Sequence, residues 1–303
     1  MLIVKGNRSH NTAAFTTPYN FCQKKCCHSS VENDNIFTRL KEKEHDNMDK
    51  FVIEKDNLQC IPCIADIPDN CNKIIIIIHG LSSSKESENA SYMMKYFAEK
   101  GLGVIAYDQP GHGMEAAANE SLLLVYCLDS LKSVEQYLIG KYPESEICYF
   151  GSSFGGYVLG IYLARGLNSG RKAFMRCAAV IFPQMIVGDV HAEPDPKAMK
   201  ILNMQGYIET VIDGQNTRFS KEFLEELKAN SMIDIYDEAQ PDNVEFSFVH
   251  GEKDPVVPVQ PVKAFAEKHG YPIVVVPYEG HSISNSPDSP AIVADVAYQL
   301  FRR

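Results

Sequence analysis

The sequence has no apolar run long enough to cross a bilayer, no excess of basic residues and no cysteine spacing typical of a disulfide framework. Its longest purely apolar run, at residues 74–78, is far shorter than the roughly 20 residues that a membrane-spanning helix needs. The chain starts MLIVKGNRSH, four apolar residues followed by polar ones, which is not the pattern of a signal peptide. We therefore expect no membrane span and a cytoplasmic location.

Acidic residues outnumber basic ones, with 39 Asp and Glu against 29 Lys and Arg, so the formal net charge is −10. A surface this acidic repels phosphate backbones, which argues against nucleic acid as a partner. The nine cysteines are an odd number and are scattered, so we expect reduced thiols. Cys60 and Cys63 form a C-x-x-C, but residues three apart in a strand face opposite sides, which argues against redox use.

Residues 1–47 are polar and lack strand or helix periodicity, so we expect a disordered N-terminal extension before a single domain at residues 48–303. The extension contains Cys22, Cys26, Cys27 and His28, a group that resembles half of a zinc site. A structural zinc site needs a second ligand pair about a dozen residues away, and none follows. We predict no metal and no cofactor; a redox or metal protein built on these cysteines remains the alternative.

From residue 51 the pattern is strands alternating with helices, which predicts an α/β sheet covered by helices on both faces. An edge hairpin is expected over residues 51–68. Short, nearly unbroken apolar runs typical of buried parallel strands occupy residues 73–78, 103–107, 147–150, 178–182, 244–249 and 272–276. Helical spacing marks residues 92–100, 121–139, 155–164, 262–269 and 291–301. Residues 184–241 are too long for one crossover and form a candidate lid.

The sharpest motif is G-x-S-x-G at Gly151, Ser153 and Gly155, placed between a predicted strand and a predicted helix. This context is that of a nucleophile elbow, in which a tight strained turn lifts a serine above the carboxyl end of a sheet. Ser153 holds the nucleophile position and Ser152 the variable one. The flanking glycines allow strand and helix to pack closely around the turn.

A serine hydroxyl needs a general base and an orienting acid, which in this type of fold follow in the order Ser, acid, His. Asp254 comes just after one late predicted strand and His281 just after the next. Asp234 and Asp237 are rival acids, but they precede the late strand instead of following it. The sequence therefore predicts a triad of Ser153, Asp254 and His281.

A tetrahedral intermediate also needs preformed donors for its oxyanion. His79 and Gly80 follow the first buried strand, where a glycine lets the backbone turn towards the site. We assign the oxyanion hole to the backbone N–H groups of Leu81 and Phe154, the latter being the residue after the nucleophile. His79 is predicted to support this loop by hydrogen bonding and not to carry a proton.

A second glycine-containing loop has the pattern Asp108-x-x-Gly111-x-Gly113. It lacks the third glycine of a dinucleotide-binding loop, so we interpret it as a structural loop that braces the site. His112 and His250 are predicted to be packing or loop-bonding residues.

Taken together, residues 51–303 resemble an α/β-hydrolase. The matching motifs are His79-Gly80, the Asp108 loop, the Ser153 elbow, Asp254 within Gly251-x-x-Asp-x-x-Val257-Pro258, and Gly280-His281. Within that superfamily the chain is similar to the cinnamoyl/feruloyl esterase and monoglyceride-lipase-like group of serine aminopeptidase-type hydrolases. One departure is Ser152, because that group often has histidine there.

The resemblance implies a carboxylic ester hydrolase with an acyl-serine intermediate, no cofactor and a small-molecule ester as substrate. The same triad also serves peptidases, thioesterases and acyltransferases, and a non-catalytic binding protein is a further alternative. Apolar side chains in residues 184–241 suggest an apolar or aromatic acyl group, although core packing explains them equally well. They are Met185, Ile186, Met199, Ile201 and Met204.

Overall fold

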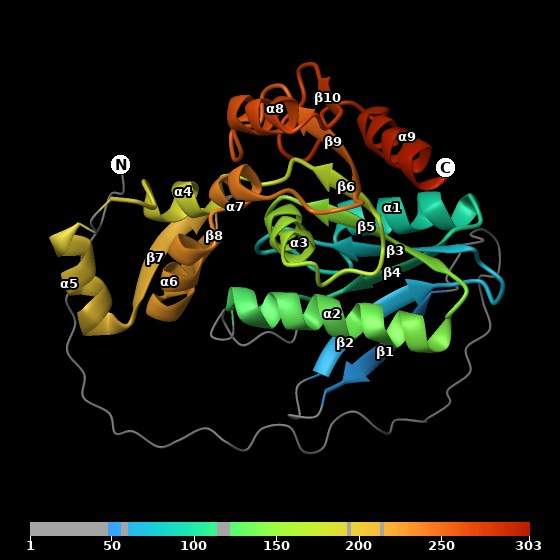
Figure 1. Ribbon diagram of the computed structural model, residues 1–303, viewed down its shortest axis with the longest axis horizontal. Coiled ribbons are helices and arrows are strands. Elements are labelled where there is room, and N and C mark those ends of the chain that lie inside the picture. The colour runs from blue at the N-terminus through green and yellow to red at the C-terminus, as the bar shows by residue number, and fades with distance from the viewer. Residues whose placement is uncertain (1–47, 56–59, 114–121, 193–194, 213–214) are drawn as a thin grey trace, which may run out of the picture. The chain divides into compact units, whose positions relative to one another are not determined.

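The computed structural model describes residues 48–303, apart from residues 56–59, 114–121, 193–194 and 213–214 (Figure 1). The predicted N-terminal extension and its cysteine-histidine group lie outside the described residues. Among the helices described, none combines the length and the apolar character needed to cross a membrane.

An eight-stranded sheet runs through the described residues in the order β1-β2-β4-β3-β5-β6-β9-β10 (Figure 1). The six strands from β4 to β10 are parallel, whereas β1 and β2 form the expected antiparallel hairpin at one edge. The strands are β1 (Asp49–Glu54), β2 (Cys60–Asp66), β3 (Lys73–Ile78), β4 (Gly103–Tyr107), β5 (Glu146–Ser152), β6 (Lys172–Arg176), β9 (Glu245–Gly251) and β10 (Ile273–Val276).

Helices cover both faces of the sheet. On one face lie α1 (Glu88–Glu99) and α9 (Ser289–Phe301); on the other lie α2 (Leu124–Lys141), α3 (Phe154–Ala164) and α8 (Val259–Lys268). The five isoleucines of β3 alternate between the two core clusters that this arrangement creates, and all are buried. A strand buried on both faces needs apolar residues at every position, which is why this segment shows no polar alternation.

The segment between β6 and β9 contains four helices and a two-stranded antiparallel sheet. They are α4 (Phe182–Val187), α5 (Pro196–Gln205), β7 (Tyr207–Ile212), β8 (Gln215–Ser220), α6 (Lys221–Ala229) and α7 (Met232–Glu238). Buried side chains of this segment, such as Phe223 and Leu227, belong to the same core cluster as α2 and α3. The segment therefore packs as part of the domain core.

One predicted strand is wrong: residues 178–182 are a turn that leads into α4, and the strand is β6, six residues earlier. Residues 173–187 are almost entirely apolar, so periodicity does not separate strand, turn and helix there. Pairing with β5 and β9 determines which residues form the strand, because it aligns Arg176 with Ser152 on one side and with Val249 on the other.

The N-terminus of α3 lies directly against the carboxyl end of β3. A Cβ atom at Gly155 would fall 2.2 Å from the Ile78 carbonyl oxygen and 2.5 Å from that of His79. Two backbone segments can approach this closely only where one of them has no side chain. The second glycine of the G-x-S-x-G motif is thus required by the packing of α3 on the sheet.

We expect Gly155→Ala to destabilise the fold by at least about 2 kcal/mol, because backbone carbonyls cannot move aside for the new methyl group. Gly140→Ala is the matched control: it lies in α2, where an added Cβ meets nothing within 4 Å. This change should instead stabilise the protein by about 0.5–1 kcal/mol. Urea unfolding of both variants tests the pair, and equal midpoints would contradict the packing argument.

Candidate active site

Ser153 stands on a strained turn between β5 and α3. Its φ is 53° and ψ −118°, a backbone conformation that residues other than glycine rarely adopt. The turn is held by hydrogen bonds on both sides: the Ser153 N–H donates to the Arg176 carbonyl at 3.0 Å, and the Ala179 N–H donates to the Ser153 carbonyl at 3.0 Å. Local strain maintained by the surrounding backbone is typical of functional sites.

The structure brings the three residues of the predicted triad together. His281 Nε2 lies 2.9 Å from Ser153 Oγ, and His281 Nδ1 lies 2.7 Å from Asp254 Oδ2. Because the carboxylate can only accept, Nδ1 carries a proton and Nε2 faces the serine hydroxyl as an acceptor. The imidazole is therefore oriented so that it can take the serine proton.

Asp254 is buried, and its carboxylate is held from several directions. Oδ1 accepts from the N–H groups of Val256 and Val257, each at 2.9 Å. Oδ2, besides facing His281, lies 3.2 Å from Nε2 of the fully buried His250, which also contacts the Val257 carbonyl. Burial alone would raise the pKa of Asp254, but hydrogen bonds from the two histidines keep it well below its usual value.

Gly80 and Leu81 lie beside the nucleophile. A Cβ at Gly80 would fall 3.2 Å from Ser153 Cβ, so the β3 loop passes directly over the turn. Leu81 lines the same pocket as Ser153 and His281. Phe154 is the first residue of α3, where a backbone N–H has no partner within the helix. Both predicted oxyanion donors thus belong to segments that border Ser153.

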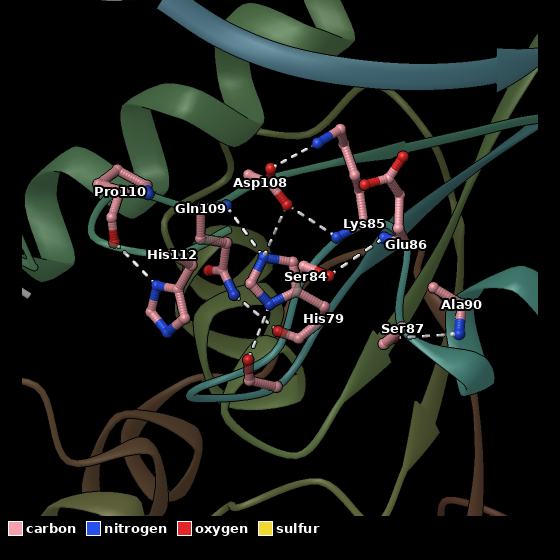
Figure 2. Close-up of polar contacts among 11 residues, drawn as sticks. His79, Ser84, Lys85, Glu86, Ser87, Ala90, Asp108, Gln109, Pro110 and His112 are labelled. Atoms are coloured by element: carbon pink, nitrogen blue, oxygen red, sulfur yellow. Dashed lines mark hydrogen bonds and ion pairs between the residues drawn. The ribbon is translucent and has the colours of Figure 1, made fainter. Parts of the chain in front are cut away.

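His79 is enclosed beneath this loop (Figure 2). Its Nε2 accepts from the Gln109 N–H at 3.1 Å, which leaves Nδ1 to donate to the Gly80 carbonyl at 2.7 Å. The Gln109 side chain in turn donates to the His79 carbonyl at 2.6 Å. Burial lowers the pKa of His79 to about 3, so the imidazole is neutral at pH 7. A neutral ring with both nitrogens hydrogen-bonded is suited to holding the loop, as the sequence predicts for His79.

A buried ion pair completes the support of the loop (Figure 2). Asp108, at the end of β4, accepts from the Lys85 backbone N–H at 2.8 Å and pairs with Lys85 Nζ at 2.7 Å. Both side chains are largely buried, at 5% exposed for Asp108 and 14% for Lys85. Sequence analysis predicted Asp108 as a structural residue but missed Lys85, because a lysine seven residues after a strand has no distinguishing pattern.

The other candidate residues have partners outside the predicted triad. Asp234 is 3.2 Å from His191, and Asp237 pairs with Lys268. Neither rival acid contacts His281, which is bonded to Asp254 instead. His112 bonds to the Pro110 carbonyl, and its ring stacks against that of Phe154 with 6.4 Å between centroids.

Arg176, at the carboxyl end of β6, is a site residue that sequence analysis missed. Its guanidinium donates to Ser152 Oγ at 2.8 Å, to the His281 carbonyl at 3.3 Å and to the Ser282 carbonyl. It thereby connects the elbow to the loop that carries the catalytic-base candidate. A charged residue within a strongly apolar segment was the available signal, but the strand was placed six residues too late to put it at the site.

Cys177, His250 and Asp254 form the one group within the described residues whose ligand atoms lie close enough for a metal, within 4.8 Å of one another. The fit is poor, because both Asp254 oxygens already accept hydrogen bonds. Burial raises the pKa of the Cys177 thiol to about 12, so a metal at this site would have to displace a tightly held proton. The C-x-x-C of β2 is also unsuited to redox chemistry, with Cys60 exposed and Cys63 buried.

Comparison with known proteins gives one family match and several similar structures. The sequence model of the family described as "Serine aminopeptidase, S33" matches residues 69–211, just under half of the chain. No curated protein matches the chain by sequence.

Many solved structures are similar to the chain, and three of them each match 84% of its length. Est1E from Butyrivibrio proteoclasticus, determined with ferulic acid bound, has a TM-score of 0.69 and 19% identity over 100% of its own chain. Alpha/beta hydrolase domain-containing protein 10 from mouse has a TM-score of 0.64 and 16% identity, and 99% of its own chain is covered. The esterase domain of a Rhodothermus marinus protein has a TM-score of 0.62 and 16% identity, and 98% of its own chain is covered. At these identities the likeness establishes the fold.

We expect Asp108→Asn to cost about 3–5 kcal/mol of stability, because it leaves the buried Lys85 ammonium without its partner. Glu267→Gln is the matched control: it breaks the exposed Lys263–Glu267 pair on α8 and should cost less than about 0.5 kcal/mol. Urea unfolding of the two variants gives the comparison. Similar losses for both would show that the Asp108 pair contributes no more than a surface contact.

Proposed function

Because this chain has the α/β-hydrolase fold and is similar over residues 69–211 to serine aminopeptidase-type hydrolases, we propose that it is a serine hydrolase that cleaves carboxylic esters. The observation that carries the proposal is the continuous chain of contacts from Ser153 through His281 to Asp254, with 2.9 Å and 2.7 Å between the bonded atoms. That arrangement, on a strained turn between a strand and a helix, is what nucleophilic catalysis by serine requires.

In the proposed mechanism Ser153 Oγ attacks the ester carbonyl carbon while His281 Nε2 takes the hydroxyl proton. The carbonyl oxygen becomes an oxyanion and is stabilised by the N–H groups of Leu81 and Phe154. Asp254 stabilises the imidazolium, which then gives its proton to the departing alcohol and leaves an acyl-serine. His281 next removes a proton from water, the resulting hydroxide attacks the acyl carbon, and the acid is released as Ser153 regains its proton.

The proposed steps require only side chains and backbone groups of this chain. They do not distinguish esters from amides, thioesters or acyl transfer to another acceptor, because the same groups serve all of these reactions. We propose ester hydrolysis first because the similar structures include one determined with ferulic acid bound and one described as an esterase domain. Rates on 4-nitrophenyl esters, acyl-CoA and aminoacyl anilides discriminate between the alternatives.

We also propose that residues 184–241 form a lid over the site. Support comes from aromatic contacts of this segment beside the elbow: the Phe223 ring lies 6.3 Å from that of Phe154 and 6.5 Å from that of Phe182, which precedes the segment, centroid to centroid. A segment anchored beside the residue that follows Ser153 is well placed to limit access to it.

The apolar side chains of this segment do not define an apolar acyl site. Ile186 is buried in the main core, and Met185 and Met199 pack against that core, whereas Met204 is 78% exposed. Of the described residues in this segment, none lines the pocket at Ser153. Core packing accounts for Met185, Ile186 and Met199, and Met204 is exposed away from the core, so we infer the acyl preference from the pocket itself.

We expect a fluorophosphonate probe to label the wild-type protein and to leave Ser153→Ala unlabelled, because the probe reacts with an activated serine hydroxyl. Hydrolysis of 4-nitrophenyl acetate should fall by about 10³-fold or more in Ser153→Ala and in His281→Gln. Ser133→Ala is the control, because this serine lies on α2 and bonds only to the Asp129 carbonyl of its own helix. It should keep wild-type labelling and rate.

Unfolding midpoints close to wild type would show that the losses are chemical and not structural. A folded wild-type protein that resists the probe and cleaves none of the substrates would overturn the proposal. It would favour the alternative of a non-catalytic binding protein on this fold.

A further inference from the structure

The pocket that contains Ser153 and His281 has apolar and polar walls, and its apolar lining is Ile77, Leu81, Ala90, Phe150 and Val256. Besides the triad and oxyanion segments, its polar lining consists of Ser83, Ser87, Asn89, Ser152, Arg176 and Ser282. Within the described residues no aspartate or glutamate lines it. In a chain with a net charge of −10, a pocket with one cation and no anion favours negatively charged ligands.

Arg176 supplies the positive charge. The residue is only 2% exposed, and its protein partners are the hydroxyl of Ser152 and two backbone carbonyls, all neutral. Its Nε is buried without a hydrogen-bond partner. In the described part of the chain, Arg176 forms no ion pair. Asp254 is near enough to act on it electrostatically, but both oxygens of that carboxylate already accept other hydrogen bonds.

The other largely buried cation at this end of the sheet, Lys85, is compensated differently, because it pairs with the carboxylate of Asp108. A buried guanidinium held in place by neutral groups alone keeps most of its field, since a low-dielectric surrounding screens it weakly.

The N-terminus of α1 also favours an anion in this pocket. Ser87 caps this 12-residue helix by accepting from the Ala90 N–H (Figure 2), and Ser87, Asn89 and Ala90 all line the pocket. A helix N-terminus carries a partial positive charge and unpaired N–H groups, which favour anions. The acidic residue of the first turn, Glu88, has an exposed side chain and does not line the pocket.

We propose that this pocket binds an acyl group that carries a negative charge, a carboxylate or a phosphate, at the end remote from the scissile carbonyl. The acyl carbon would be attached to Ser153, and the charged end would lie towards Arg176 and the N-terminus of α1. This inference rests on the proposed acyl-serine mechanism, because it assigns the acyl side of that substrate. It replaces the apolar acyl group that the sequence suggested.

The test compares mono-4-nitrophenyl esters of succinic, glutaric and adipic acid with the same esters capped as methyl esters. Each pair differs in one negative charge and little else, and the spontaneous rate is subtracted. For at least one chain length we expect kcat/KM to be about tenfold higher for the charged ester, the scale of one buried charge acting across several ångströms. Inhibition of neutral-ester hydrolysis by succinate or by inorganic phosphate shows whether the pocket prefers a carboxylate or a phosphate group.

Variants separate the charge of Arg176 from its hydrogen bonds. In Arg176→Gln the charged-to-neutral ratio should fall close to one, whatever happens to the absolute rates. Arg176→Lys retains the positive charge but loses the planar guanidinium with its several N–H donors. It should lower the rates for both esters and preserve most of the charged-to-neutral ratio. Similar losses on both esters in Arg176→Gln, with the ratio unchanged, would mean that Arg176 only positions the elbow and the His281 loop.

Asn89→Asp provides a test that spares Arg176. It adds a negative charge to the pocket wall, and an acidic residue in the first turn suits the helix. We expect the charged-to-neutral ratio to fall at least about threefold. Asn72→Asp makes the same change at an exposed loop position outside the pocket and should leave the ratio unaltered.

The two proposals fail in different ways. A protein that reacts with the fluorophosphonate probe and cleaves neutral esters, but shows no preference for any charged ester, would overturn the anionic subsite and leave the serine hydrolase intact. A protein that neither reacts with the probe nor cleaves either ester would overturn both.

Discussion

The close contact between the N-terminus of α3 and the end of β3 is the constraint on which the site depends. It places Gly155 against two backbone carbonyls and Gly80 over Ser153, so the proposed nucleophile and the proposed oxyanion loop meet without an intervening side chain. The positive φ at Ser153 follows, because the chain must reverse sharply between β5 and α3. The strain is balanced by the burial of α3, of which ten residues are buried.

The motifs predicted the centre of the site because each lies where a parallel strand ends. Ser153, Asp254 and His281 follow β5, β9 and β10, and parallel strands bring their carboxyl ends to one edge. The fold was equally predictable where strands are buried on both faces, as in the isoleucine run of β3. Local sequence is enough to predict a site residue when one short segment carries both the structural signal and the chemical group.

What the sequence did not reveal depends on contacts between distant segments. The role of Lys85 is visible only from its contact with Asp108, 23 residues later. The role of Arg176 is visible only from the contacts of its guanidinium with Ser152 and Ser282, which lie in other segments. The boundary between β6 and α4 was also hidden, since an apolar stretch suits strand and helix alike. Ser152 illustrates the same limit: its hydroxyl accepts a hydrogen bond from Arg176, 24 residues later, and the motif gives no sign of that contact.

The shared core of the 184–241 segment has a consequence for how this protein can diversify. Phe223, Leu227 and Tyr236 belong to one continuous apolar cluster with α2 and α3, so the segment is not an appendage that recombination could exchange as a block. Change is easier at single exposed positions such as Met204. Divergence among close descendants of this chain should therefore accumulate as point substitutions on the outer surface of the segment, with its length and aromatic anchors retained.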